Sequence, residues 1–250
     1  MEFNMRLTIV IMLMFALAGC ATKQTKEPGG ADPPAVINAK LGLGYLRQGN
    51  YDVALTKLEK ALQQDPKLAM AHHYIAELYR QTGEYELAGE HFERAVKLDP
   101  KDPQLQNNYG VFLCDQKRYQ EAEKRFLKIA AMTSYKRPDE AYENAGLCAL
   151  RMPDLVKAEK YFRKALEINP KRHSSLYQMA QLSFDTHEYL KARAFLQRYF
   201  SISEQTPQTL WLGIRIEREL GDEEALARYT KLLLDKFPDS DEARSASSIK

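Results

Sequence analysis

The 250-residue sequence has few cysteines, no basic run and none of the short motifs that mark common catalytic sites. Its 36 lysines and arginines are balanced by 34 aspartates and glutamates, so charge gives no reason to expect nucleic-acid binding. It contains no H-E-x-x-H, no G-x-S-x-G and no phosphate-binding Gly-Lys-Ser/Thr loop. We therefore expect neither an enzyme nor a nucleic-acid-binding protein, and no cofactor.

The three cysteines and five histidines follow no metal-ligand spacing, and we expect no metal site. Cys114 and Cys148 are the two cysteines beyond the N-terminal region. An oxidising compartment permits a disulfide between them. We expect two small, half-buried thiols instead.

Long apolar runs are also absent, except near the start of the chain. Residues 7–17 are apolar but too few to cross a membrane core of about 30 Å, so residues 1–19 are interpreted as a secretory signal. The sequence Leu-Ala-Gly-Cys at 17–20 resembles the bacterial lipobox, which implies cleavage before Cys20 and acylation of Cys20. The alternatives left open are a signal peptide that ends in a chance cysteine, and a start at either Met1 or Met5.

A cysteine that carries two or more acyl chains anchors a protein stably to a membrane without spanning it. Ala21 follows the cysteine, which by resemblance to bacterial sorting signals favours the outer membrane. Residues 20–34 are polar, contain Gly-Gly and Pro-Pro, and show no periodicity. They are predicted to form the lipidated N-terminus and a flexible tether.

What the sequence does contain is a recurring helical pattern, clearest in residues 69–102. Two segments there have small or apolar residues three or four apart, as on one face of a helix. Gly83 lies between the segments and Pro100 ends the second one, because proline cannot continue a helix. The stretch is predicted to form a helix, a turn and a second helix.

This pattern recurs about every 34 residues. In its period, in its small residues at helix crossings and in its terminal proline it resembles the tetratricopeptide repeat (TPR). The resemblance implies an all-α superhelix of twelve helices in six units: 35–68, 69–102, 103–138, 139–172, 173–206 and 207–240. Gly42, Gly110 and Gly146 are predicted to lie where first helices pack closely against second helices. Residues 241–250 are predicted to be a frayed tail, with a short extra helix as the alternative.

The resemblance also implies which residues face the hollow of the superhelix, where the repeat family receives peptides. Counted from the first residue of each unit, these are positions 2, 5, 9, 12 and 13. In unit one they are unexpectedly apolar apart from Arg47, and such patches usually mark an interaction site. A weaker patch lies in unit four, and a tryptophan lies in unit six. The predicted partner-binding residues are Val36, Ala39, Leu43 and Leu46, then Leu147 and Leu150, then Trp211. Two alternatives stay open for unit one: the tether covers its apolar residues, or the unit packs slightly rotated.

The LAGC box, the six units and the run TLWLGIRIER at 209–218 together resemble the type IV pilus pilotin lipoproteins, the PilF/PilW family. The resemblance spans the mature chain. It implies an outer-membrane lipoprotein that faces the periplasm and is monomeric apart from its partner. That partner would be the secretin subunit of the type IV pilus, whose localisation and multimer assembly the protein would assist. The alternative is an adaptor for another envelope machine, such as peptidoglycan enzymes or outer-membrane assembly.

Overall fold

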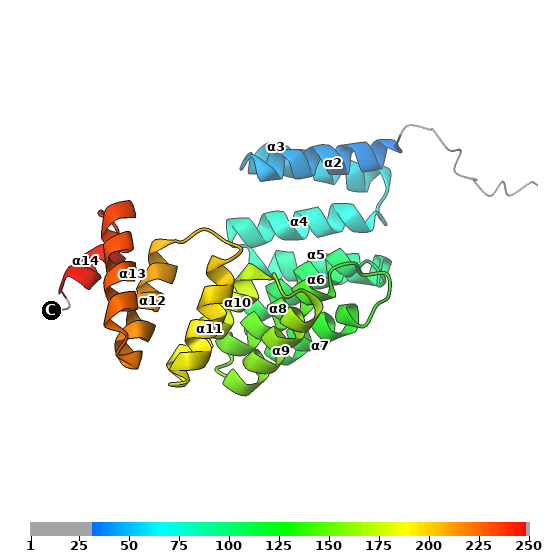
Figure 1. Ribbon diagram of the computed structural model, residues 1–250. Helices are drawn as coiled ribbons and strands as arrows, with labels where there is room; N and C mark the ends of the chain where they lie inside the picture. Colours follow the sequence, from blue (N-terminus) through cyan, green and yellow to red (C-terminus); the bar gives the residue numbers. More distant parts are fainter. Residues whose placement is uncertain (1–31, 249–250) are drawn as a thin grey trace, which may run out of the picture.

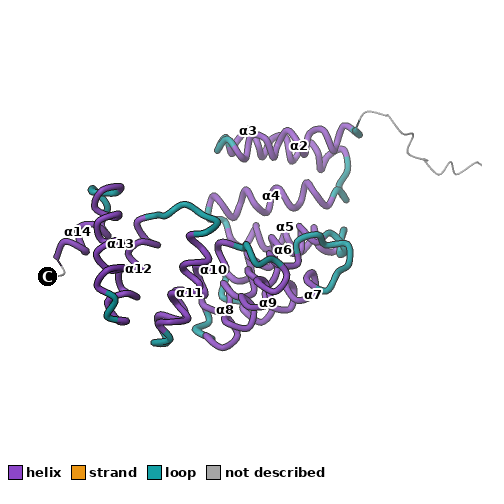
Figure 2. The backbone as a smooth tube through the Cα atoms, viewed as in Figure 1, coloured by secondary structure: helices purple, strands orange, loops and turns teal. Residues whose placement is uncertain are grey.

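The computed structural model describes residues 32–248, which form 13 α-helices and no strand (Figures 1 and 2). The helices pair into six antiparallel hairpins, and a short helix follows the last pair. The first helices of the hairpins are α2 (Pro34–Arg47), α4 (Ala69–Thr82), α6 (Pro103–Asp115), α8 (Pro138–Arg151), α10 (His173–Asp185) and α12 (Pro207–Leu220). The second helices are α3 (Tyr51–Gln64), α5 (Tyr85–Leu98), α7 (Tyr119–Ala130), α9 (Leu155–Ile168), α11 (Tyr189–Phe200) and α13 (Glu223–Lys236).

Each hairpin stacks on the next, with α2 and α3 at one end of the array and α12, α13 and α14 (Asp241–Ser248) at the other (Figure 1). A single hairpin would leave an apolar face in water, and stacking buries those faces in a nearly continuous core. The predicted all-α TPR array is confirmed.

Local sequence explains where the helices begin. Proline is the first residue of α2, α6, α8 and α12, a position where its missing N–H costs nothing. The Asp102 carboxylate caps α6 by accepting hydrogen bonds from the N–H groups of Gln104 and Leu105, at 2.8 and 3.1 Å. Thr206 and Thr209 form a capping box at the start of α12.

The turn between the two helices of a hairpin requires one residue with positive φ. Glycine fills this position in units one, two and six, at Gly49, Gly83 and Gly221. Lys117 and His187 occupy it in units three and five, with φ of 62° and 61°. The turn is therefore the same in all these units although glycine is not.

The three predicted crossing glycines do lie at close helix contacts. A Cβ atom on Gly110 would lie 2.6 Å from Cε1 of Phe126, which is too close to be tolerated. Gly146 meets Phe162 at 2.7 Å, and Gly42 meets Leu58 at 2.6 Å, in the same way. Each glycine belongs to a first helix and each large partner to the second helix of the same unit.

Two expectations were wrong. Residues 241–248 do not fray: they form α14, which buries Ala243 and Ala246 against α12 and α13, as the alternative of an extra helix predicted. Cys114 and Cys148 are joined by a disulfide, with their Cα atoms 5.8 Å apart. They are 34 residues apart, one repeat, and this spacing places them side by side on α6 and α8.

Cys20 and most of the predicted tether lie outside the described residues. Within residues 32–248, no helix is both long and apolar enough to cross a membrane.

Candidate binding surface

The predicted binding residues of unit one do not share one environment. Ala39 and Leu46 are 0% and 4% exposed, in the same core cluster as Leu58 and Leu78. The expectation that they face the hollow was wrong. The position of Leu46 in its unit is that of Cys114 in unit three, which reaches to the next unit through its disulfide. Positions 5 and 12 of unit one thus pack unit one against unit two.

Val36 and Leu43 are half-buried and keep part of their surface in water. The most exposed aliphatic side chains of α2 are Ile37 and Leu41, at 43% and 46%, and the sequence reasoning missed them. They occupy unit positions 3 and 7. In later units these positions are at most 3% exposed wherever a side chain is present: Ala71, Ile75, Leu105, Tyr109, Ala141, Ala145, Ser175, Met179 and Thr209.

The reason for this contrast is the order of the stack. Positions 3 and 7 pack against the preceding unit, and within the described residues no unit precedes α2. The sequence contained this signal: unit one carries large apolar residues, Ile37 and Leu41, at the two positions that later units bury against the preceding unit. At 100° per residue, Val36, Ile37, Leu41 and Leu43 lie on one continuous exposed arc of α2. We call these four residues the α2 patch.

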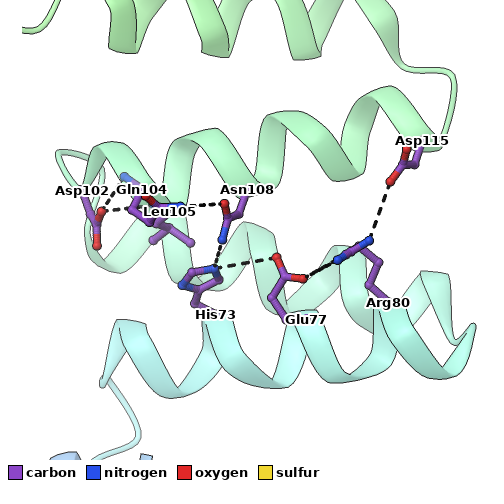
Figure 3. A network of polar contacts seen from close by, with 8 residues as sticks. All are labelled: His73, Glu77, Arg80, Asp102, Gln104, Leu105, Asn108 and Asp115. Atoms are coloured by element: carbon purple, nitrogen blue, oxygen red, sulfur yellow. Dashed lines mark hydrogen bonds and ion pairs between the residues drawn. The ribbon is translucent and has the colours of Figure 1, made fainter. Parts of the chain in front are cut away.

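The middle of the array has a different inner surface, which carries a polar network across units two and three (Figure 3). The Asn108 amide donates to Nε2 of His73 at 2.9 Å, and Oε1 of Glu77 lies 3.9 Å from the same nitrogen. Arg80 pairs with Glu77 at 2.9 Å and reaches Asp115 at 3.9 Å. Asp115 also pairs with Arg151 of unit four.

Burial sets the protonation of this network. It lowers the pKa of His73 to about 4, so the ring is neutral at pH 7 and Nε2 can accept from Asn108. Burial also raises the pKa of Glu77, against the opposing effect of Arg80. The charged groups of the network are paired with each other. It therefore ties three units together and leaves little for a partner to satisfy.

The other predicted residues are distant in the array from the α2 patch. Leu147 and Leu150 on α8 are half-buried against the central core. Trp211 on α12 is half-buried against the cluster that α14 closes. Near it, the Arg215 guanidinium lies 4.1 Å from the centre of the Phe184 ring. The seven predicted residues thus belong to three separate places rather than one surface.

Among residues 32–248, no three histidine, cysteine or acidic side chains gather as metal ligands would. The surface that the fold offers is a row of first helices, with an apolar end that no unit among residues 32–248 covers. Tetratricopeptide-repeat family models match residues 39–103 and 102–171. The chain is thus a TPR protein, a class whose arrays bind other proteins.

Two relatives narrow this class. The type IV pilus assembly protein PilF of Pseudomonas aeruginosa is 35% identical over 241 residues, which cover 95% of this chain and 96% of that protein. An uncharacterised protein of Haemophilus influenzae is 30% identical over 162 residues, 65% of this chain and 90% of that protein.

Solved structures agree. The structure of Pseudomonas aeruginosa PilF matches 87% of this chain and 98% of its own, with 34% identity and a TM-score of 0.74. That of PilW, a widely conserved type IV pilus biogenesis factor, matches 87% and 100%, with 28% identity and a TM-score of 0.77. The chain belongs to the PilF/PilW family of type IV pilus assembly proteins, which are TPR scaffolds and not enzymes.

Proposed function

We propose that this protein is an outer-membrane lipoprotein, anchored through Cys20, that binds the secretin subunit of the type IV pilus. It assists the localisation of the secretin and its assembly into multimers, and so pilus biogenesis. The membership in the PilF/PilW family supports a role in pilus assembly. The lipobox-like sequence at 17–20 supports the anchor and the periplasmic orientation.

The observation that carries the binding proposal is the α2 patch. Ile37 and Leu41 expose 43% and 46% of their surface at positions that every later unit covers. Fully burying such a side chain is worth roughly 1.5–3 kcal/mol, so covering the exposed halves of these two gains about 1.5–3 kcal/mol in sum. Val36 and Leu43 add to this. We assign the main contact to the α2 patch, and we keep Leu147, Leu150 and Trp211 as weaker, separate contacts.

Association costs several kcal/mol in lost freedom, which is at least as large as this gain, so the patch alone gives only weak binding. The lipid anchor offsets part of that cost by holding the patch near the membrane into which the secretin inserts. Anchor and patch are therefore both needed, and each can be tested alone.

The test of the patch is Leu41→Glu in the full-length, lipidated protein. We expect normal folding, because the side chain is exposed, and loss of secretin from pull-downs together with loss of SDS-resistant secretin multimers. The matched control is Val156→Glu on α9, where an 81% exposed aliphatic side chain receives the same charge far from α2. Normal multimers in the Leu41 variant would refute the assignment of the patch.

The test of the anchor is Cys20→Ser. We expect unprocessed or soluble protein, and secretin that is misplaced or poorly assembled although the α2 patch is intact. A variant that is processed normally and still fractionates with the outer membrane would contradict the lipid site.

A further inference from the structure

Gly44 is required neither by the packing nor by the backbone of the chain itself. Gly44 lies inside α2 with an ordinary helical backbone, and a Cβ atom there would meet no described atom within 4 Å beyond its own helix backbone. Glycine inside a helix destabilises it relative to alanine, because glycine loses more backbone freedom on folding. Gly42, Gly110 and Gly146 lie at close helix crossings, and Gly49, Gly83 and Gly221 have positive φ. A Cβ atom would lie 3.1 Å from Tyr229 on Gly213 and 3.6 Å from Phe112 on Gly89, so Gly44 is the one described helical glycine that faces open space.

Gly44 is at unit position 10, which in each later unit meets the preceding unit. Cys148 holds this position in unit four, and its disulfide runs to Cys114 of unit three. The other residues at this position are larger and at most 5% exposed: Leu78, Phe112, Leu182 and Ile216. Unit one thus has apolar side chains at positions 3 and 7 of this face, but an empty space at position 10.

The residues around Gly44 give the empty space the form of a hole between four positions of one helix. Ile37, Lys40, Leu41 and Gly44 stand at i, i+3, i+4 and i+7, which is the set that forms a hole for one side chain of a facing helix. Lys40 lends its aliphatic stem to the hole, while its ammonium pairs with Asp32 at 2.5 Å. Because Gly44 has no side chain, one wall is missing and the hole is wide.

We propose that the partner segment that docks on the α2 patch is an amphipathic α-helix, which inserts a large apolar side chain over Gly44. This inference rests on the proposed function and names the form of the partner. The same face of every later first helix is covered by helices of the preceding unit, so the docked helix continues the stack. An extended segment would gain little, because residues 32–248 contain no sheet edge with which its backbone could pair.

The decisive variants are Gly44→Ala and Gly44→Leu in the full-length protein. Both fill empty space on a helix that prefers either residue to glycine, so thermal unfolding should shift upward by about 1–4 °C. Both obstruct the hole, so secretin recovered by pull-down should fall, slightly for alanine and about tenfold or more for leucine. Stability and binding thus move in opposite directions. Gly89→Ala on α5 is the matched control, since its Cβ would lie 3.6 Å from Phe112 in ordinary contact.

The conformation of the partner is tested by a photoreactive benzoylphenylalanine in place of Lys40, with the attachment sites on secretin mapped by mass spectrometry. A helix predicts attachment at residues three or four apart, whereas attachment at every second residue would overturn the proposal. Normal binding by Gly44→Leu would also overturn it. If Leu41→Glu still abolished binding in that case, the proposed function would stand and the helix would not.

Two other occupants of the hole would show in the same variants. A lower melting temperature for Gly44→Leu with binding retained would mean that the chain's own N-terminal residues cover α2. A dimer of the parent protein that Gly44→Leu dissociates in sedimentation would mean that a second copy covers it. Either result overturns the proposal.

Discussion

The two ends of the array are finished in different ways. At the C-terminal end, α14 lies on α12 and α13 with Ala243 and Ala246 at 1% and 6% exposure, and its outer side carries polar residues. At the N-terminal end, α2 presents Ile37 and Leu41 about half-exposed. Stacked repeats need a polar cap wherever the stack stops. The chain provides one at a single end of the described array, and we assign partner binding to the other.

The joints near the two ends also differ in chemistry. Between units five and six, Glu217 is 2% exposed and pairs with Arg193, which also reaches Asp222 at 3.1 Å. Separating such a pair leaves a buried charge without a partner, so this joint resists opening. The α2 patch consists of apolar side chains, so a partner can leave it without stranding a buried charge. The following predictions test this contrast, from the largest expected effect to the smallest.

The disulfide joins unit three to unit four, and so links the two halves of the array. Replacing both Cys114 and Cys148 by serine should lower the free energy of unfolding by about 2–4 kcal/mol, because the bond closes a long loop in the unfolded chain. Urea unfolding of the parent and the variant, with and without a reducing agent, measures this. If the reductant leaves the parent unchanged, the two sulfurs are not joined.

The cap is tested by Ala243→Glu, which places a carboxylate in the apolar contact between α14 and α12. We expect a loss of about 2–3 kcal/mol, because a charge cannot be buried there without a partner. Leu41→Glu at the other end should change stability by less than about 0.5 kcal/mol. If thermal unfolding shows the same loss of stability for Leu41→Glu as for Ala243→Glu, then Leu41 is buried in the folded protein, as Ala243 is.

Leucine at two glycines of first helices should act in opposite ways. Gly110→Leu should cost about 1–3 kcal/mol, since a Cβ there already lies 2.6 Å from Phe126. Gly44→Leu should be stabilising. A neutral result for Gly110 would mean that α6 and α7 cross elsewhere.

Most of the fold could be predicted from the sequence, because each repeat gives an independent test of the pattern seen in the others. The pattern repeats every 34 residues, with glycines at helix crossings and prolines at helix ends in equivalent positions. The structure confirms the helix pairs and the close crossings at Gly42, Gly110 and Gly146. The disulfide could have been predicted from the same repetition. Cys114 and Cys148 are one period apart, and positions one period apart on adjacent first helices are neighbours.

The binding surface was harder to predict because a helix of this array has three kinds of surface rather than two. It contacts its own second helix, the neighbouring units and the hollow. Ala39 and Leu46 are apolar like Val36 and Leu43, yet they face unit two while the latter stay partly open. Composition cannot separate these pairs. Comparing equivalent positions across units can, and it is what identifies Ile37 and Leu41.

Acid should weaken unit two through its buried histidine. The pKa of His73 is about 4 in the fold, below its ordinary value of 6.5, because burial disfavours the charged ring. The unfolded chain therefore takes up a proton first as pH falls below 6.5, and stability is lost between about pH 6.5 and 4. The loss should reach about 1–2 kcal/mol at pH 5. Urea unfolding at pH 7.5 and 5 measures it, and His73→Gln should flatten the difference. An unchanged slope in that variant would assign the effect to other groups, such as His91, whose pKa is also about 4.

The smallest effect concerns the left-handed position of the turns, which glycine holds in some units and a larger residue in others. Units one, two and six use glycine at the left-handed position, whereas Lys117 holds it in unit three with φ of 62°. A residue with a side chain is strained there and glycine is not, so Lys117→Gly should stabilise the protein by about 0.5–1 kcal/mol. The greater freedom of glycine in the unfolded chain opposes this gain and sets its upper limit. Thermal unfolding of Lys117→Gly and His187→Gly should show similar rises, while Gly83→Lys should show a fall of the same size. If Lys117→Gly lowers the melting temperature while Gly83→Lys does not, the turns of units two and three do not share the left-handed conformation.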